Sequence, residues 1–440
     1  MTEVTHRVRK RARRQDADCP GVTLITTPKD NAPVIADQAG LSRFIDELEP
    51  GAPIAVDAER AHSYRYSSKA YLVQLRQAHC GTRLLDPIAL AQPDDLAHLE
   101  KLSDALADSE WVLHAASQDL PCLAEIGLVP HRIFDTELAG RLLGLQRVSL
   151  SPMLTHFLGI ELAKEHSADD WSRRPLPAQW LAYASLDVDY LLELRDAVAA
   201  ELDATGKAEW AAQEFTDIAD RFAHVPQPDD DRWRHTKGMA RLGQPRQLGV
   251  ARALWHVRDQ LAQEIDMAPG RILSDAALVD AASALAKMPP GHVAEALTNL
   301  TGMTGRFIKR RQKRWVEAVE EVLASDPRKW PARQRSAHNT PPPSLWPRTN
   351  PAAAARWAVA RPALMALTEK YQVPPENVLT VATLAEIVWP DGDFSETGLR
   401  AAMADAHVRP WQQELAAPIL AAALKDVAET AHPTTATPSR

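Results

Sequence analysis

A chain of 440 residues is long enough for about three domains. Its 45% hydrophobic and 25% charged residues are typical of a globular protein, and no segment approaches the ~18 consecutive apolar residues of a membrane span. The first residues lack the apolar segment of a secretory signal, and the three cysteines are scattered without the spacing of a metal site or a disulfide framework, so we expect a cytoplasmic protein with no membrane partner.

Charge is distributed unevenly along the chain. The net charge of −8 disfavours nucleic-acid binding over the whole surface. Residues 1–20 are nevertheless basic, with the cations Arg7, Arg9, Lys10, Arg11, Arg13 and Arg14. We expect this segment to be a disordered, solvated tail, with contact to phosphate groups as the alternative.

The first third of the chain contains several strand patterns. Residues 22–25 predict a short strand, residues 41–48 an amphipathic helix, and residues 54–59 a buried strand. Two more strands follow at 71–75 and 83–86, and three strands in close succession predict an antiparallel meander. A helix at 96–106 and a strand at 111–113 come next, so this mixed order predicts an α/β domain with a mixed sheet.

The strand at 54–59 carries two carboxylates, Asp57 and Glu59. Residues two apart on a strand point to the same side, so both carboxylates can face one point. Buried carboxylates repel each other and are costly to desolvate, and a divalent cation removes both costs. A site made of carboxylates favours Mg²⁺ or Mn²⁺ over zinc. A chance pattern is the alternative, because the same spacing recurs at Asp135 and Glu137.

Two further acids follow later strands or precede helices. Asp119 lies in the segment His114-Ala115-Ala116-Ser117-Gln118-Asp119-Leu120, at a turn from strand to helix. A capping role alone would explain an acid there. Asp135 stands before a helical pattern with Glu137 in its first turn, and we interpret Asp135 as a structural cap.

A helix predicted at about 178–200 carries Tyr183 and Asp187. Four residues apart, they share one helix face, where a phenol and a carboxylate can position and deprotonate a metal-bound water. An ordinary surface pair with a buried tyrosine ring is the alternative. Arg174, in the preceding proline-rich turn, either contacts a substrate phosphate or supports the site.

These segments together resemble a known family. D-x-E on a strand, H-A-x-S-x-D-L after a later strand and Y-x-x-x-D on a helix resemble the three exonuclease motifs of the DEDD superfamily in its tyrosine form. The intervening segments Asp170-Trp171, Arg174-Pro175-Leu176 and 158–162 resemble ribonuclease D, over about residues 22–200.

The resemblance implies a ribonuclease H-like sheet and 3′→5′ exonuclease activity that uses two divalent cations, Mg²⁺ or Mn²⁺. It assigns the metal ligands as Asp57, Glu59, Asp119 and Asp187 and gives Tyr183 the role of orienting the attacking water. Asp189 lies near the third motif but does not match its position. Release of nucleoside 5′-monophosphates would follow.

The second half of the chain is predicted to be helical from Trp233 to Ala324. The segment 302–315 resembles part of an HRDC domain and contains Phe307, Trp315 and six cations, namely Arg306, Lys309, Arg310, Arg311, Lys313 and Arg314. Cations beside aromatic rings suit a nucleic-acid strand, and a solvated helix face with core aromatics is the alternative.

The C-terminal part repeats the helical region in a degenerate form. The segment 267–274 matches the segment 373–380, and Leu261 and Leu278 match Leu367 and Leu384 at the same offset of 106 residues (367 − 261). The repeat lacks the basic cluster, and packing against the first helical domain is one role for it.

We therefore predict an α/β, ribonuclease H-like mixed-sheet exonuclease domain followed by two all-α HRDC-like domains. The predicted divisions are a basic tail at 1–20, the exonuclease domain at 21–225, an HRDC domain at 233–326, a proline-rich linker at 327–351, a second HRDC-like domain at 352–428 and a tail at 429–440.

The leading functional hypothesis is a metal-dependent 3′→5′ exoribonuclease that acts on structured RNA such as tRNA precursors. A DNA exonuclease acting on single-stranded DNA in repair is the second hypothesis, since the same acids serve both substrates. A non-catalytic nucleic-acid-binding scaffold is the third, and the presence of all four acids argues against it.

Overall fold

The structure is a computed structural model that describes residues 21–91, 96–163, 169–223, 231–332 and 340–431. The predicted tail at 1–20, most of the tail at 429–440 and part of the linker lie outside these residues. Among the described helices, none is both long and apolar enough to cross a membrane.

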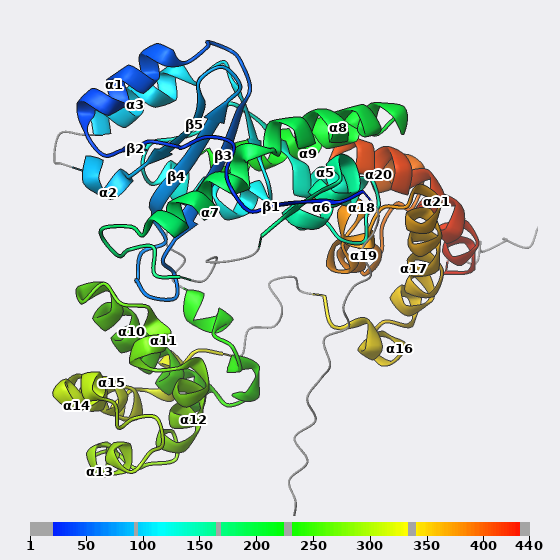
Figure 1. The fold of residues 1–440 in the computed structure, drawn as a ribbon. Helices are drawn as coiled ribbons and strands as arrows, with labels where there is room; N and C mark the ends of the chain where they lie inside the picture. The colour runs from blue at the N-terminus through cyan, green and yellow to red at the C-terminus, as the bar shows by residue number, and fades with distance from the viewer. Residues whose placement is uncertain (1–20, 92–95, 164–168, 224–230, 333–339, 432–440) are drawn as a thin grey trace, which may run out of the picture.

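The N-terminal part is built on a mixed six-stranded sheet with the strand order β2-β5-β4-β3-β6-β7 (Figure 1). The predicted meander is confirmed, because β3, β4 and β5 pair antiparallel, whereas β6 and β7 extend the sheet in parallel. The strands are β1 (Thr23–Ile25), β2 (Val34–Ile35), β3 (Ile54–Arg60), β4 (Ala70–Gln77), β5 (Gly81–Leu85), β6 (Glu110–Leu113), β7 (Arg132–Asp135) and β8 (Ile160–Leu162).

Helices cover this sheet and supply its core. Ile54, Ala55 and Val56 on β3 have no exposed surface, as expected for a central strand flanked on both faces. The helices are α1 (Gln38–Glu47), α2 (Pro87–Leu90), α3 (Leu96–Ala105), α4 (Leu120–Ala124), α5 (Thr136–Leu142), α6 (Leu150–Leu158), α7 (Ala178–Asp189), α8 (Leu191–Ala204) and α9 (Ala208–Phe222).

One sequence-based assignment in this part was wrong in detail, and three short strands were missed. The helix predicted at 178–200 is two helices, α7 and α8, because the backbone leaves the helical conformation at Tyr190. The break follows Asp189, whose buried carboxylate accepts hydrogen bonds from the Lys29 amide and the Thr82 hydroxyl. The strands β2, β7 and β8 have two to four residues, too few for a period-two pattern to reveal them.

The first helical module has its own hydrophobic core, which includes Trp233, Trp255 and Trp315. It contacts the sheet domain through the loop 61–69 between β3 and β4: Arg271 donates to the Ser63 carbonyl at 2.7 Å, and the Tyr66 hydroxyl donates to Asp259 at 3.0 Å. Its helices are α10 (Pro245–Glu264), α11 (Pro269–Ile272), α12 (Asp275–Leu285), α13 (Val293–Thr298), α14 (Arg306–Arg310) and α15 (Gln312–Ala324).

The C-terminal helical module shares the core of the sheet domain. The suggestion that it packs against the first helical module was wrong: Arg409 forms an ion pair with Glu214 of α9 at 2.8 Å, and the rings of Trp411 and Trp210 stack at 4.8 Å. Its helices are α16 (Trp346–Thr349), α17 (Pro351–Tyr371), α18 (Pro375–Val378), α19 (Val381–Val388), α20 (Glu396–Asp405) and α21 (Pro410–Ala431).

The internal repeat also appears in the local structure of the two helical modules. The short helices α11 and α18 begin 106 residues apart (375 − 269), as do α12 and α19 (381 − 275). Ser274 and Thr380 occupy equivalent positions and cap the second helix of their pair. The side chain of each accepts a hydrogen bond from the backbone N–H three residues further along the chain. The offset seen in the sequence therefore reflects a repeated helix-turn-helix unit.

Candidate active site

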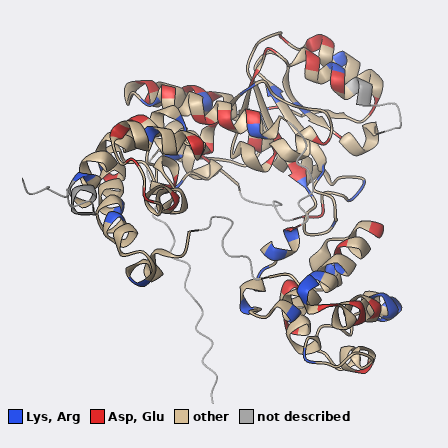
Figure 2. Cartoon of the chain, turned by 180° about the vertical axis from the view of Figure 1, so that it is seen from behind, with Lys and Arg blue, Asp and Glu red and all other residues tan. Residues whose placement is uncertain are grey.

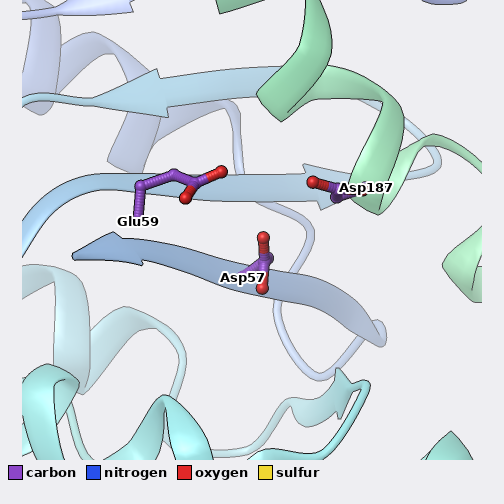
Figure 3. A group of neighbouring side chains, drawn as sticks. All are labelled: Asp57, Glu59 and Asp187. Carbon is purple, nitrogen blue, oxygen red and sulfur yellow. The ribbon is translucent and has the colours of Figure 1, made fainter. Parts of the chain in front are cut away.

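The first carboxylates of the site come from the middle of β3. Asp57 and Glu59 lie on the same face of the strand, and α7 crosses that face with Asp187 (Figure 3). One carboxylate oxygen from each of these three residues lies within 4.8 Å of the others. The structure therefore brings together residues that are 128 and 130 positions apart in sequence (187 − 59 and 187 − 57).

Asp119 lies beside this group but is not one of the three residues gathered within 4.8 Å. It occupies the N-cap position of α4, as the sequence predicted, yet its side chain makes no capping hydrogen bond. The residue is 4% exposed, and its carboxylate lies 3.6 Å from the guanidinium of Arg60. A capping role therefore does not account for Asp119.

Burial and mutual repulsion shift the carboxylates away from their ordinary pKa values. Burial raises the pKa of Asp57, and it raises the pKa of Glu59, Asp119 and Asp187 well above the usual range. The negative charge of Asp57 raises the pKa of the other three further. Ionising these buried carboxylates together is unfavourable without a positive charge nearby. A hard divalent cation, which prefers oxygen ligands, would supply that charge.

Tyr183 lies one helical turn before Asp187 on α7. Burial raises the pKa of the Tyr183 phenol, and the Asp187 carboxylate raises it further. A hydrogen bond from Tyr183 in turn lowers the pKa of Asp187. The phenol is therefore protonated near neutral pH, which favours an orienting role over the removal of a proton.

Arg60 is a site residue that the sequence reasoning missed. The pairing of β3 with β4 shifts register between Glu59 and Arg60, and such a bulge changes the direction in which a side chain points. The Arg60 guanidinium thereby faces Asp119, and its charge lowers the pKa of Asp57, Glu59 and Asp119. The types of the residues around Arg60 do not indicate the bulge, so the sequence could not predict that Arg60 faces Asp119.

Asp135 is the structural cap that the sequence predicted. Its carboxylate accepts hydrogen bonds from the backbone amides of Glu137 and Leu138 in α5, and from those of Ala115 and Ala116 in the turn after β6. Burial raises its pKa to about 6 despite these four donors. Asp135 therefore fixes the turn that leads to Asp119.

Arg174 supports the domain from within. Its guanidinium donates to both carboxylate oxygens of Asp86 at 2.8 Å and to the carbonyls of Tyr71 and Trp171 at 2.7 and 2.8 Å. These contacts occupy all three nitrogens. Of the two roles that the sequence left open, the structure favours support over contact with phosphate.

The basic cluster lies on α14 and at the start of α15, at the outer edge of the first helical module (Figures 1 and 2). Arg306, Lys309 and Arg310 on α14 are exposed. Trp315 is fully buried in the module's core, so its ring is not a surface for stacking bases. Two members of the cluster have acidic partners, because Arg314 pairs with Glu264 at 2.8 Å and Lys313 with Glu317 at 3.6 Å.

Known protein families match three parts of the chain. A family described as 3′-5′ exonuclease matches residues 33–203, and the HRDC domain matches residues 247–319. A family described as 3′ to 5′ exonuclease C-terminal domain matches residues 339–424. The matched ranges follow the sheet domain and the two helical modules in order.

Curated relatives carry one common name. A ribonuclease D of Sphingobium indicum is 32% identical over 57% of this chain and 64% of its own length. A ribonuclease D of Acidiphilium cryptum is 30% identical over 68% of this chain and 73% of its own length.

Solved structures share the whole arrangement. A protein from Bifidobacterium adolescentis aligns with a TM-score of 0.77 and 31% identity, over 92% of this chain and 100% of the other. RNase D of Escherichia coli, described as an exoribonuclease involved in structured RNA processing, aligns with a TM-score of 0.65 over 90% and 99% of the two chains. At 21% identity, that second likeness concerns the fold alone.

Proposed function

The chain belongs to the ribonuclease D family and is a 3′–5′ exoribonuclease, and from that premise we propose that it shortens structured RNA, such as tRNA precursors, with a pair of divalent cations. The observation that carries this proposal is the group of partly buried carboxylates of Asp57, Glu59 and Asp187, whose oxygens lie within 4.8 Å of one another. The products would be nucleoside 5′-monophosphates.

Four acids would hold the cations. Asp57, Glu59 and Asp187 offer carboxylate oxygens within 4.8 Å of one another, and Asp119 lies beside them, close enough for the charge of Asp57 to raise its pKa. Carboxylate oxygens favour Mg²⁺ or Mn²⁺. When bound, such cations would supply the positive charge that lowers the pKa of the attacking water and stabilises the leaving 3′ oxygen of an in-line displacement.

The protein's own groups would orient the reactants. Tyr183, held by its hydrogen bond to Asp187, presents a protonated phenol beside the acids and would fix the attacking water by a hydrogen bond. Arg60 is 27% exposed and would offset negative charge as an RNA phosphate enters. Asp135 would act only through the backbone of 115–116, as a support for Asp119.

The first helical module would hold the RNA. The exposed cations of α14 suit phosphate groups, and hydrogen bonds to the loop 61–69 join this module to the strand that carries Asp57 and Glu59. Preference for RNA over DNA rests on family membership, because no residue of the site is tied to a 2′-hydroxyl. Single-stranded DNA is the second candidate substrate.

A gel assay with 5′-labelled single-stranded RNA and DNA tests the proposal. With Mg²⁺ or Mn²⁺, wild-type protein is expected to give a ladder that shortens from the 3′ end of RNA, and Asp57→Ala is expected to give none. Degradation of DNA alone would assign the protein to the repair class. Binding without cleavage would favour the scaffold hypothesis.

A salt titration tests the basic cluster. Replacement of Lys309, Arg310 and Arg311 by alanine is expected to weaken RNA binding and to flatten the dependence of log Kd on log salt by up to about two to three units, because each lost phosphate contact removes about 0.7–0.9 units. Arg43→Ala with Lys101→Ala, on α1 and α3 of the sheet domain, is the control. An unchanged slope would remove the cluster from the RNA path.

A further inference from the structure

Gln74, on β4, carries a buried amide whose hydrogen-bonding groups are unsatisfied within the part of the chain that the structure describes. Its side chain has no exposed surface, and neither Oε1 nor Nε2 has a partner among the described residues. Gln77 on the same strand is just as buried, but its amide exchanges hydrogen bonds with the backbone of Glu49 and Ala52. Buried amides are ordinarily satisfied, so Gln74 is an exception that calls for an explanation.

The position of Gln74 in the sheet is next to the first catalytic acid. In the antiparallel pairing of β3 with β4, Gln74 stands directly opposite Asp57. Residues opposite each other share a face of the sheet, with Cβ atoms about 5 Å apart. Gln74 therefore projects from the same face as Asp57, within reach of its carboxylate.

The helix α7 covers this same face. Arg76, two residues further along β4 and on the Gln74 face, reaches Asp189 at the end of α7 at 3.5 Å. Asp187, on α7, faces Asp57 from above the strand. In the sheet, Gln74 thus stands between Asp57, its partner on β3, and Leu84, its partner on β5, with no exposed surface.

We propose that Gln74 is a positioning residue, whose Nε2 donates a hydrogen bond to the Asp57 carboxylate when cations are bound. Cation binding requires the Asp57 carboxylate to be fully ionised and to keep one orientation. An amide N–H beside the carboxylate would fix that orientation without adding charge. Gln74 touches no reacting atom in this role. The inference rests on the proposed cation site and adds a supporting residue to it.

Gln74→Met tests this in the full-length protein, since methionine keeps the length of the side chain and removes both polar groups. The variant is expected to unfold at an unchanged or higher temperature without metal, because it removes an unsatisfied buried amide. Its Kd for Mn²⁺, measured by calorimetry without RNA, is expected to rise about 10-fold to 100-fold. Its lost activity on RNA should return at raised Mn²⁺.

Two controls keep the result decisive. Ser109→Ala removes a buried hydroxyl just before β6 that has no partner in the described part of the chain, and it should leave the Kd for Mn²⁺ unchanged. Gln74→Leu should repeat the result of Gln74→Met with a differently shaped side chain. An unchanged Kd in folded Gln74→Met overturns the inference, as does failure of both variants to fold, because the amide would then have a structural partner.

The same titration on Asp57→Ala separates this inference from the proposed function. Loss of Mn²⁺ binding in Asp57→Ala with no effect of Gln74→Met would leave the cation site standing and remove Gln74 from it. Mn²⁺ binding by Asp57→Ala as strong as in wild type would remove the site itself.

Discussion

Two copies of the pattern Asp-x-Glu, at Asp57 and at Asp135, have their aspartate on strands of the same sheet, and their surroundings differ. Asp57 and Glu59 lie within β3, where other carboxylates approach them from α7 and from the start of α4. Asp135 ends β7 and is met by four backbone N–H groups, and Glu137 pairs with Arg141 one turn along α5. The carboxylates of the first copy lie near other carboxylates, and the Asp135 carboxylate of the second copy lies among hydrogen-bond donors.

The neighbours of a carboxylate decide what it does. Carboxylates that face one another cost stability until a cation arrives, which is the condition of a binding site. A carboxylate that accepts several N–H groups is already satisfied and stabilises the fold. Variants of the two copies should therefore affect different quantities.

The largest expected effect is the loss of catalysis in Asp57→Asn. This substitution removes one carboxylate charge from the proposed cation site. It should lower the rate on 5′-labelled RNA by a factor on the order of 10³ or more. The melting temperature without metal should stay the same or rise, since a buried, repelling charge is gone. Activity within tenfold of wild type would contradict the assignment of β3 as the catalytic strand.

The next effect is on stability, in Asp135→Ala. This variant removes one helix cap and leaves the part-buried amide of Ala115 and the buried amide of Ala116 without their acceptor, which should cost about 3 kcal/mol of unfolding free energy. Urea unfolding measures it, with Asp57→Ala as the matched control that should lose far less. Equal losses in the two variants would erase the contrast between the copies.

Arg60 offers a pH measurement on the first copy. The raised pKa values of Glu59 and Asp119 mean that protons compete with cations, so Mn²⁺ binding weakens as pH falls. Arg60 lowers those pKa values, so Arg60→Gln should raise them and move the midpoint of Mn²⁺ binding to a higher pH.

Calorimetry across pH, with Arg141→Gln on the second copy as control, measures this shift. Arg141→Gln should leave the midpoint in place, because Arg141 pairs with Glu137 and not with the acids of β3. A midpoint that stays fixed or moves to lower pH in Arg60→Gln would show that Arg60 does not set the charge of the site.

Much of this arrangement could be predicted from residue type and spacing. The buried strand of Asp57, the shared helix face of Tyr183 and Asp187, and the cap at Asp135 follow from local periodicity and capping preferences. The position of Arg60 could not be predicted, because it depends on a register shift between two strands. The packing of the C-terminal module against α9 depends on contacts such as that of Arg409 with Glu214, 195 residues apart.

Glu137→Gln should have the least effect of these variants, and it tests directly whether the second copy of the pattern differs in function from the first. Glu137 has the same place in the pattern as Glu59, yet its carboxylate only pairs with Arg141, a partly exposed partner on the next helical turn. Loss of such a pair costs about 0.3–0.5 kcal/mol, so urea unfolding should change by no more than that. The rate on RNA should not change. A loss of Mn²⁺ affinity in this variant would mean that the second copy also takes part in cation binding, and the two copies would no longer be distinguished by their neighbours.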